Sequence, residues 1–149
     1  MIRYLWPVAV VALASCSSPA PQPQPQPTDV CALLRSGDAG NLTGASKDAQ
    51  SCDYTFDTLT VRLSLRAEKY ADAAIALGPD AYGAVVETHP MTRRCADASG
   101  IVTCDSVVEV RDGQLIGLKV VQRNHDVNLV GQTTQGLAAR ALERLPVTS

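Results

Sequence analysis

The sequence has few aromatic residues, which make up 4% of its 149 residues. Tyr4 and Trp6 lie in an N-terminal apolar segment, so the rest of the chain has no tryptophan. Its remaining aromatic residues are Tyr54, Phe56, Tyr70 and Tyr82. A sugar-binding platform usually presents tryptophan or several tyrosines as flat, partly polar surfaces. The shortage of such residues disfavours carbohydrate binding.

The motifs of common hydrolases and nucleotide-binding enzymes are also missing. The sequence contains no GxSxG, SxxK, HExxH or P-loop pattern. It has two histidines, His89 and His125, each in a stretch predicted to be a polar loop, where a lone histidine is usually solvated. We therefore expect a protein that is not an enzyme and that uses no cofactor.

An excess of positive charge is absent as well. Lys and Arg number 13 against 15 Asp and Glu, which gives a net charge of -2, and the basic residues form no run. Binding to nucleic acid or to anionic lipid normally requires a basic patch. The composition therefore excludes both as predicted partners.

No apolar run is long enough to span a bilayer, which takes about 20 residues. The longest, from Leu5 to Ala14, follows the basic residue Arg3 and contains Pro7, which disfavours a membrane helix. A basic start, a short apolar core and small residues are typical of a secretory signal. Residues 1–15 are therefore predicted to be a signal peptide.

The end of this segment, Leu13-Ala14-Ser15-Cys16, resembles the lipobox of bacterial lipoproteins. The resemblance implies that Cys16 accepts a diacylglycerol, that cleavage occurs before Cys16, and that the new amino group can then be acylated. Two acyl chains are enough for stable anchoring. We therefore expect a protein attached by lipid on Cys16 to the extracytoplasmic face of the cell membrane.

Residues 16–28 are predicted to form a tether. Proline alternates with glutamine through Pro21, Pro23, Pro25 and Pro27. Such a segment favours extended polyproline II, at about 3.1 Å per residue, and gives about 35–40 Å of reach. A spacer is the preferred interpretation, and a motif for a proline-recognising partner is the alternative.

Residues 29–149 are predicted to form one domain with two disulfides. Beyond Cys16, the cysteines are Cys31, Cys52, Cys95 and Cys104, an even number in a chain predicted to be exported. Three connectivities are possible, and pairing sequence neighbours is the simplest. The rival, a zinc site, lacks a CxxC spacing and a nearby histidine pair, so we expect no metal.

Hydrophobic periodicity predicts the elements of this domain. In one segment Val61, Leu63 and Leu65 alternate with polar residues, as in a strand with one wet face, and Asp112-Gly113 predicts a hairpin turn. We expect helices over 29–34, 68–77 and 127–145, strands over 52–56, 60–66, 84–87, 101–110 and 114–121, an irregular segment over 37–51, and a polar loop from His89-Pro90 to Cys95. The expected fold is α+β, an antiparallel β-meander packed against two or three helices as a two-layer sandwich.

The last helix is predicted to be amphipathic. The residues expected on its apolar face are Leu129, Gly136, Leu137, Ala141 and Leu145, and those expected on its polar face are Arg140, Glu143 and Arg144. Asp126 and Asn128 could begin a calcium loop, but helix capping explains Asp126 more simply.

The order of these features resembles a family of small cell-envelope lipoproteins of actinobacteria whose function is unknown. The resemblance lies in the lipobox, the Pro-rich spacer, Cys31-x-Leu33-Leu34 and Cys52-x-Tyr54. It implies a disulfide between Cys31 and Cys52, and it implies no catalytic residue.

Candidate ligand-binding residues are few. Arg93 and Arg94 could contact an anionic ligand, and His125 lies in the turn before the last helix. The favoured hypothesis is a non-enzymatic binding or accessory module that docks an envelope protein or a small molecule on a sheet face or the loop 87–97. Alternatives are a carrier of an apolar ligand, which needs an apolar cavity, and a hydrolase, which needs converging Ser, His and Asp.

Overall fold

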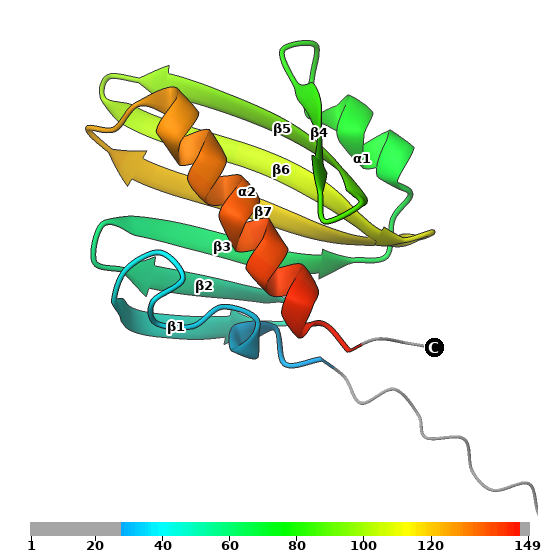
Figure 1. Cartoon of the computed structure of the whole chain (residues 1–149), viewed down its shortest axis with the longest axis horizontal. Helices are drawn as coiled ribbons and strands as arrows, with labels where there is room; N and C mark the ends of the chain where they lie inside the picture. Colours follow the sequence, from blue (N-terminus) through cyan, green and yellow to red (C-terminus); the bar gives the residue numbers. More distant parts are fainter. Residues whose placement is uncertain (1–27, 147–149) are drawn as a thin grey trace, which may run out of the picture.

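The computed structural model describes residues 28–146 as one antiparallel sheet with two helices (Figure 1). The predicted signal peptide, Cys16 and all of the tether but Thr28 lie outside the described residues. The strands are β1 (Leu42–Asp48), β2 (Ser51–Phe56), β3 (Leu59–Arg66), β4 (Tyr82–Val86), β5 (His89–Ala98), β6 (Ile101–Arg111) and β7 (Gln114–Arg123). The helices are α1 (Tyr70–Ala76) and α2 (Val127–Arg144), preceded by the 3-10 turn η1 (Val30–Ala32).

The strand order is β1-β2-β3-β7-β6-β5-β4, and every neighbouring pair is antiparallel. Two meanders, β1–β3 and β4–β7, join where β3 pairs with β7 in the middle of the sheet. The chain crosses from β3 to the far edge through α1 before it returns strand by strand (Figure 1). The α+β class and the antiparallel sheet are therefore confirmed.

The main core lies between the sheet and α2. Alternate residues of each central strand point to this side, so that Val61 and Leu63 of β3 pack with Leu118 and Val120 of β7. The residues that α2 buries are Val130, Gly131, Thr134, Leu137, Ala138 and Ala141. Most of these are small, so the helix approaches the sheet closely.

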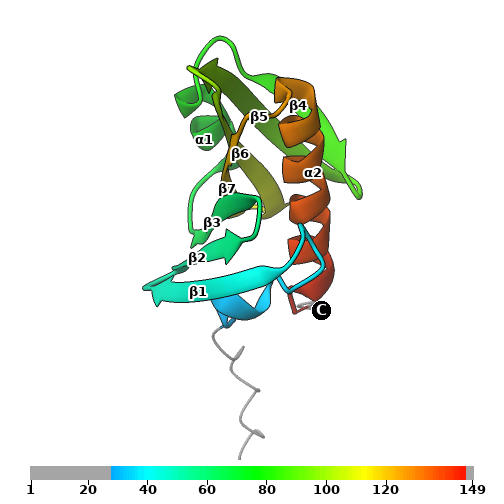
Figure 2. The same cartoon turned by 90° about the vertical axis from the view of Figure 1, so that its left-hand side faces the viewer.

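The shorter helix α1 lies on the opposite side of the sheet (Figure 2). It forms a small separate cluster in which Ala73 contacts Val107 and Leu115, whose strand neighbours Val108 and Ile116 belong to the main core. The sheet and α2 are therefore the two principal layers, and α1 covers only part of the second face.

Both predicted disulfides are present with the expected pairing. Cys31–Cys52 fastens η1 to β2, with the Cα atoms 5.2 Å apart. Cys95 and Cys104 are directly opposed in β5 and β6 and form the second bridge.

Two predicted irregular segments are strands instead. Within 37–51 the chain forms β1, an edge strand that is almost wholly exposed, so its sequence shows no apolar alternation. The predicted polar loop before Cys95 belongs to β5, in which Met91, Arg93 and Cys95 face α2 while Thr92 and Arg94 face away. Arg93 lies at an inward-facing position, so a charged residue interrupts the alternation of apolar and polar residues that would have predicted a strand.

The predicted apolar face of α2 is partly wrong. Leu137 and Ala141 are buried, but Leu129 is 51% exposed and Gly136 is also exposed. Arg144, predicted to be on the polar face, is largely covered because it pairs with Asp38. The buried stripe is centred on small residues, which a search for large apolar side chains underweights.

Candidate functional site

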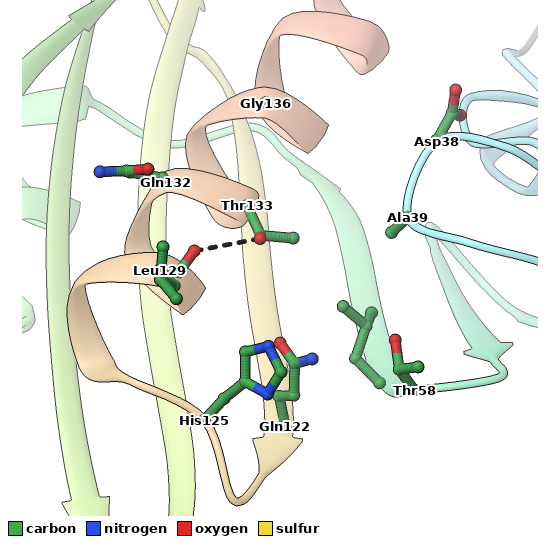
Figure 3. Close-up of a pocket in the computed structure, with 10 residues that line it drawn as sticks. Asp38, Ala39, Thr58, Gln122, His125, Leu129, Gln132, Thr133 and Gly136 are labelled. Carbon is green, nitrogen blue, oxygen red and sulfur yellow. Dashed lines mark hydrogen bonds between the residues drawn. The ribbon is translucent and has the colours of Figure 1, made fainter.

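A groove of about 400 Å³ lies between the N-terminal half of α2 and the opposite wall, formed by residues 38–39 and the β2–β3 turn (Figure 3). Its polar lining residues are Asp38, Thr58, Gln122, His125, Gln132 and Thr133. Its other lining residues are Ala39, Leu59, Leu129 and Gly136. The volume falls within the range of about 300–1,000 Å³ that is usual for small-ligand sites.

Gly136 keeps one side of this groove open. It lies in the interior of α2, where glycine costs about 1 kcal/mol relative to alanine. A Cβ atom built at Gly136 would meet nothing within 4 Å. The missing side chain therefore leaves free space in the groove rather than permitting a close packing contact.

Gln122 forms the floor of the groove. It ends the inward-facing series Ile116, Leu118, Val120 on β7, and its neighbours across the sheet are Leu59 and Val102. Gln122 is only 7% exposed, and its side chain makes no hydrogen bond to any other residue in the range 28–146. No buried side-chain nitrogen or oxygen atom in residues 28–146 lacks a hydrogen-bond partner, so the polar atoms of the Gln122 amide reach the solvent of the groove, where water or a ligand can bond to them.

Three further side chains on the rim are also uncommitted, which means here that they make no hydrogen bond to another described residue. Thr58, His125 and Gln132 are exposed, and within residues 28–146 none of them is hydrogen-bonded through its side chain. Figure 3 shows His125 next to Gln122 at one end of the groove. Thr133 differs, because its hydroxyl donates to the Leu129 carbonyl at 3.0 Å.

Asp38, on the opposite wall, is held by an ion pair with Arg144 of α2. Arg144 donates to both carboxylate oxygens, one of them at 2.9 Å, and also to the Leu33 carbonyl at 3.0 Å. The Arg35 backbone N–H donates to the same carboxylate at 2.7 Å. These hydrogen bonds lower the pKa of Asp38, and the carboxylate in turn raises the pKa of Arg144. The ion pair therefore links the segment that carries Asp38 to α2.

The structure separates the two arginines proposed to bind an anion. Arg93 lies under α2 at 9% exposure, donates to the Tyr82 hydroxyl at 2.9 Å and to the Gly131 carbonyl, and lies over the Tyr82 ring. Arg94 points to the other face and donates to the Leu77 carbonyl at 3.3 Å. They form no common site, whereas His125 does line the groove.

Within residues 28–146, the structure brings no catalytic serine–histidine pair and no set of metal ligands together. No hydrogen bond in this range joins a serine to a histidine, and His89 Nδ1 instead bonds to the Glu109 carbonyl at 2.8 Å. The described part of the chain also has no group of three or more residues suited to hold a metal. Asp126 caps α2, accepting from the Asn128 and Leu129 N–H groups, which confirms the capping interpretation.

Sequence reasoning missed Gln122, although a signal was present. A polar residue at the fourth inward-facing position of an otherwise apolar strand must either find a partner or face an opening. Sequence alone could not show which, because the opening depends on how α2 and the β2–β3 turn meet above it.

No family model matches the chain, and a search of curated proteins finds no similar sequence. None of the helices described here is both long and apolar enough to cross a membrane.

Proposed function

We propose that this protein is a non-enzymatic binding module of the bacterial cell envelope and that its ligand occupies the groove beside α2. Lipid on Cys16 would hold the protein at the outer face of the membrane, and the proline-rich segment would act as a spacer. The lipobox-like residues Leu13-Ala14-Ser15-Cys16 and the short apolar leader support this placement.

The observation that carries the proposal is the Gln122 side chain. Gln122 is only 7% exposed, its amide makes no hydrogen bond within residues 28–146, and the polar atoms of that amide are accessible from the groove that it lines. An apolar residue would suit a purely structural role at this inward-facing position, which follows Ile116, Leu118 and Val120 on β7. An amide that is open to the groove can instead bond to a ligand there.

The groove gives less support to the carrier alternative. A carrier would enclose an apolar ligand in a cavity lined by Val and Leu, but this groove is open and six of its ten lining residues are polar. Leu59 and Leu129 are the only large apolar residues in its lining. The groove is therefore better suited to a ligand that is held at its polar groups.

Native mass spectrometry of the oxidised protein, purified as its host exports it, tests the proposal. We expect a non-covalently bound mass on the wild-type protein and its loss in Gly136→Leu, which fills the groove. Gln135→Leu is the matched control, because Gln135 lies on the other flank of α2 and bonds to the Val85 carbonyl. Equal spectra for wild type and Gly136→Leu would contradict the proposal.

A further inference from the structure

We infer that the groove binds an uncharged peptide segment with small aliphatic side chains and that Gln122 pairs with its main-chain amide. This inference rests on the proposed function and specifies the class of ligand. It depends on three properties of the groove: the type of its uncommitted polar groups, its charge, and its apolar surface.

The uncommitted polar groups both donate and accept hydrogen bonds. The Gln122 amide presents one N–H and one carbonyl in the same plane, which matches the N–H and carbonyl of a peptide group. Gln132 on α2 and Thr58 on the β2–β3 turn offer the same dual capacity from the two sides of the groove. A peptide main chain, which alternates donors and acceptors, complements such a lining.

The charge of the lining favours an uncharged ligand. Asp38 is the only carboxylate in the lining, and Arg144 already pairs with it. Neither lysine nor arginine belongs to the lining, so nothing there is placed to form a bidentate ion pair with a carboxylate or a phosphate. An internal stretch of peptide, without chain ends, satisfies this condition.

The apolar part of the groove is aliphatic. Leu59 at 6% exposure and Leu129 at 51% exposure offer methyl groups on opposite sides, and the lining has no Trp, Tyr or Phe on which a sugar ring could stack. The groove is open to solvent rather than enclosed. These features favour a peptide with Ala- or Leu-sized side chains over a sugar.

Titration of the ¹⁵N-labelled, oxidised, exported protein with the capped tripeptide acetyl-Ala-Leu-Ala-amide tests the inference. We expect saturable shifts of the Gln122 and Gln132 side-chain amide signals at millimolar peptide. Gln122→Met keeps the length of the side chain and removes the amide. It should weaken binding about tenfold, because the peptide then loses hydrogen bonds to Gln122 that contribute about 1.4 kcal/mol. Gln135→Met makes the same change outside the groove and should bind like the wild type.

Glucose and acetate are run in parallel as an uncharged sugar and an anion. Shifts of the groove signals with either probe at lower concentration than with the tripeptide would overturn the peptide assignment and leave the proposed function standing. Equal peptide affinity in wild type and Gln122→Met would also overturn the peptide assignment. If no probe binds and no bound mass is lost on Gly136→Leu, the proposed function fails together with the inference.

Discussion

At the scale of single residues, Gly136 and Gln122 are both poor choices for stability where they lie. A glycine in a helix interior costs about 1 kcal/mol relative to alanine, and an amide at an inward-facing strand position replaces an apolar side chain that could pack in the core. Both line the same groove. Natural proteins often retain such local costs at functional positions, so their coincidence here supports the assignment of the site.

Gly136→Ala should stabilise the protein by about 0.5–1 kcal/mol, because alanine is the better helix former and its Cβ meets open space. The free energy of unfolding from urea titration measures this change. Gly131→Ala on the same helix is the matched control. Its Cβ would lie 3.0 Å from Arg93 Cζ, so it should destabilise the protein. Destabilisation by both variants would show that Gly136 is also tightly packed.

Asp38→Asn should cost about 2 kcal/mol at neutral pH, because it leaves Arg144 without its carboxylate partner. The pKa of Asp38 is lower in the folded state than its ordinary value of 3.8. Its contribution is therefore complete above that value and is lost as the pH falls through the folded-state pKa.

Urea titrations of wild type and Asp38→Asn across this pH range check the sign. The gap between their free energies of unfolding should be widest at neutral pH and should close in acid. A gap that stays constant, or that widens as the pH falls, would show that the ion pair does not carry the effect.

At the scale of elements, strands with one buried face were predictable and exposed or mixed strands were not. Val61, Leu63 and Leu65 show the alternation that predicts β3, and Asp112-Gly113 predicts the β6–β7 hairpin. By contrast, β1 is an exposed edge whose residues meet no core, so pairing with β2 defines it. Such pairing is a tertiary effect that local sequence does not encode.

The η1 turn depends on its disulfide and on Tyr54. Cys31–Cys52 joins residues that are 21 positions apart in the chain, and the Tyr54 hydroxyl donates to the Val30 carbonyl and accepts from the Leu34 N–H. Replacing both cysteines by alanine should lower the free energy of unfolding by about 3 kcal/mol in the chain-entropy model.

Hydrogen exchange gives the local readout for this double variant. Backbone amides of η1 should lose protection, while those of β6 and β7 change only with global stability. A uniform loss of protection over all elements would indicate that the bridge supports the whole fold rather than the turn.

At the scale of the whole molecule, the proposed location depends on contiguous residues, whereas the binding surface does not. The lipobox-like residues 13–16 and the apolar segment before them are continuous in the sequence, but the groove combines residues from separate elements, such as Asp38, Leu59, Gln122 and Gln132. Residues so far apart in the chain meet only because β3 pairs with β7 and α2 returns across the sheet. No local pattern could reveal that meeting.

Cys16→Ala should remove the protein from the membrane, because no acyl chain could then be attached at that position. We expect the variant in the culture medium or as an uncut precursor, while the wild type sediments with membranes. Cell fractionation with intact-mass measurement distinguishes these forms. A Cys16→Ala protein that is still membrane-bound at the mature mass would refute lipid attachment at Cys16.

The central claim is that a ligand occupies the groove beside α2, and intermolecular nuclear Overhauser effects between the capped tripeptide and protein methyl groups test it most directly. We predict contacts from the peptide to the methyl groups of Leu59 and Leu129. Ile75 and Val85, which are 78% and 65% exposed but do not line the groove, provide the internal comparison. Contacts to Ile75 or Val85 with none to Leu59 or Leu129 would contradict the account.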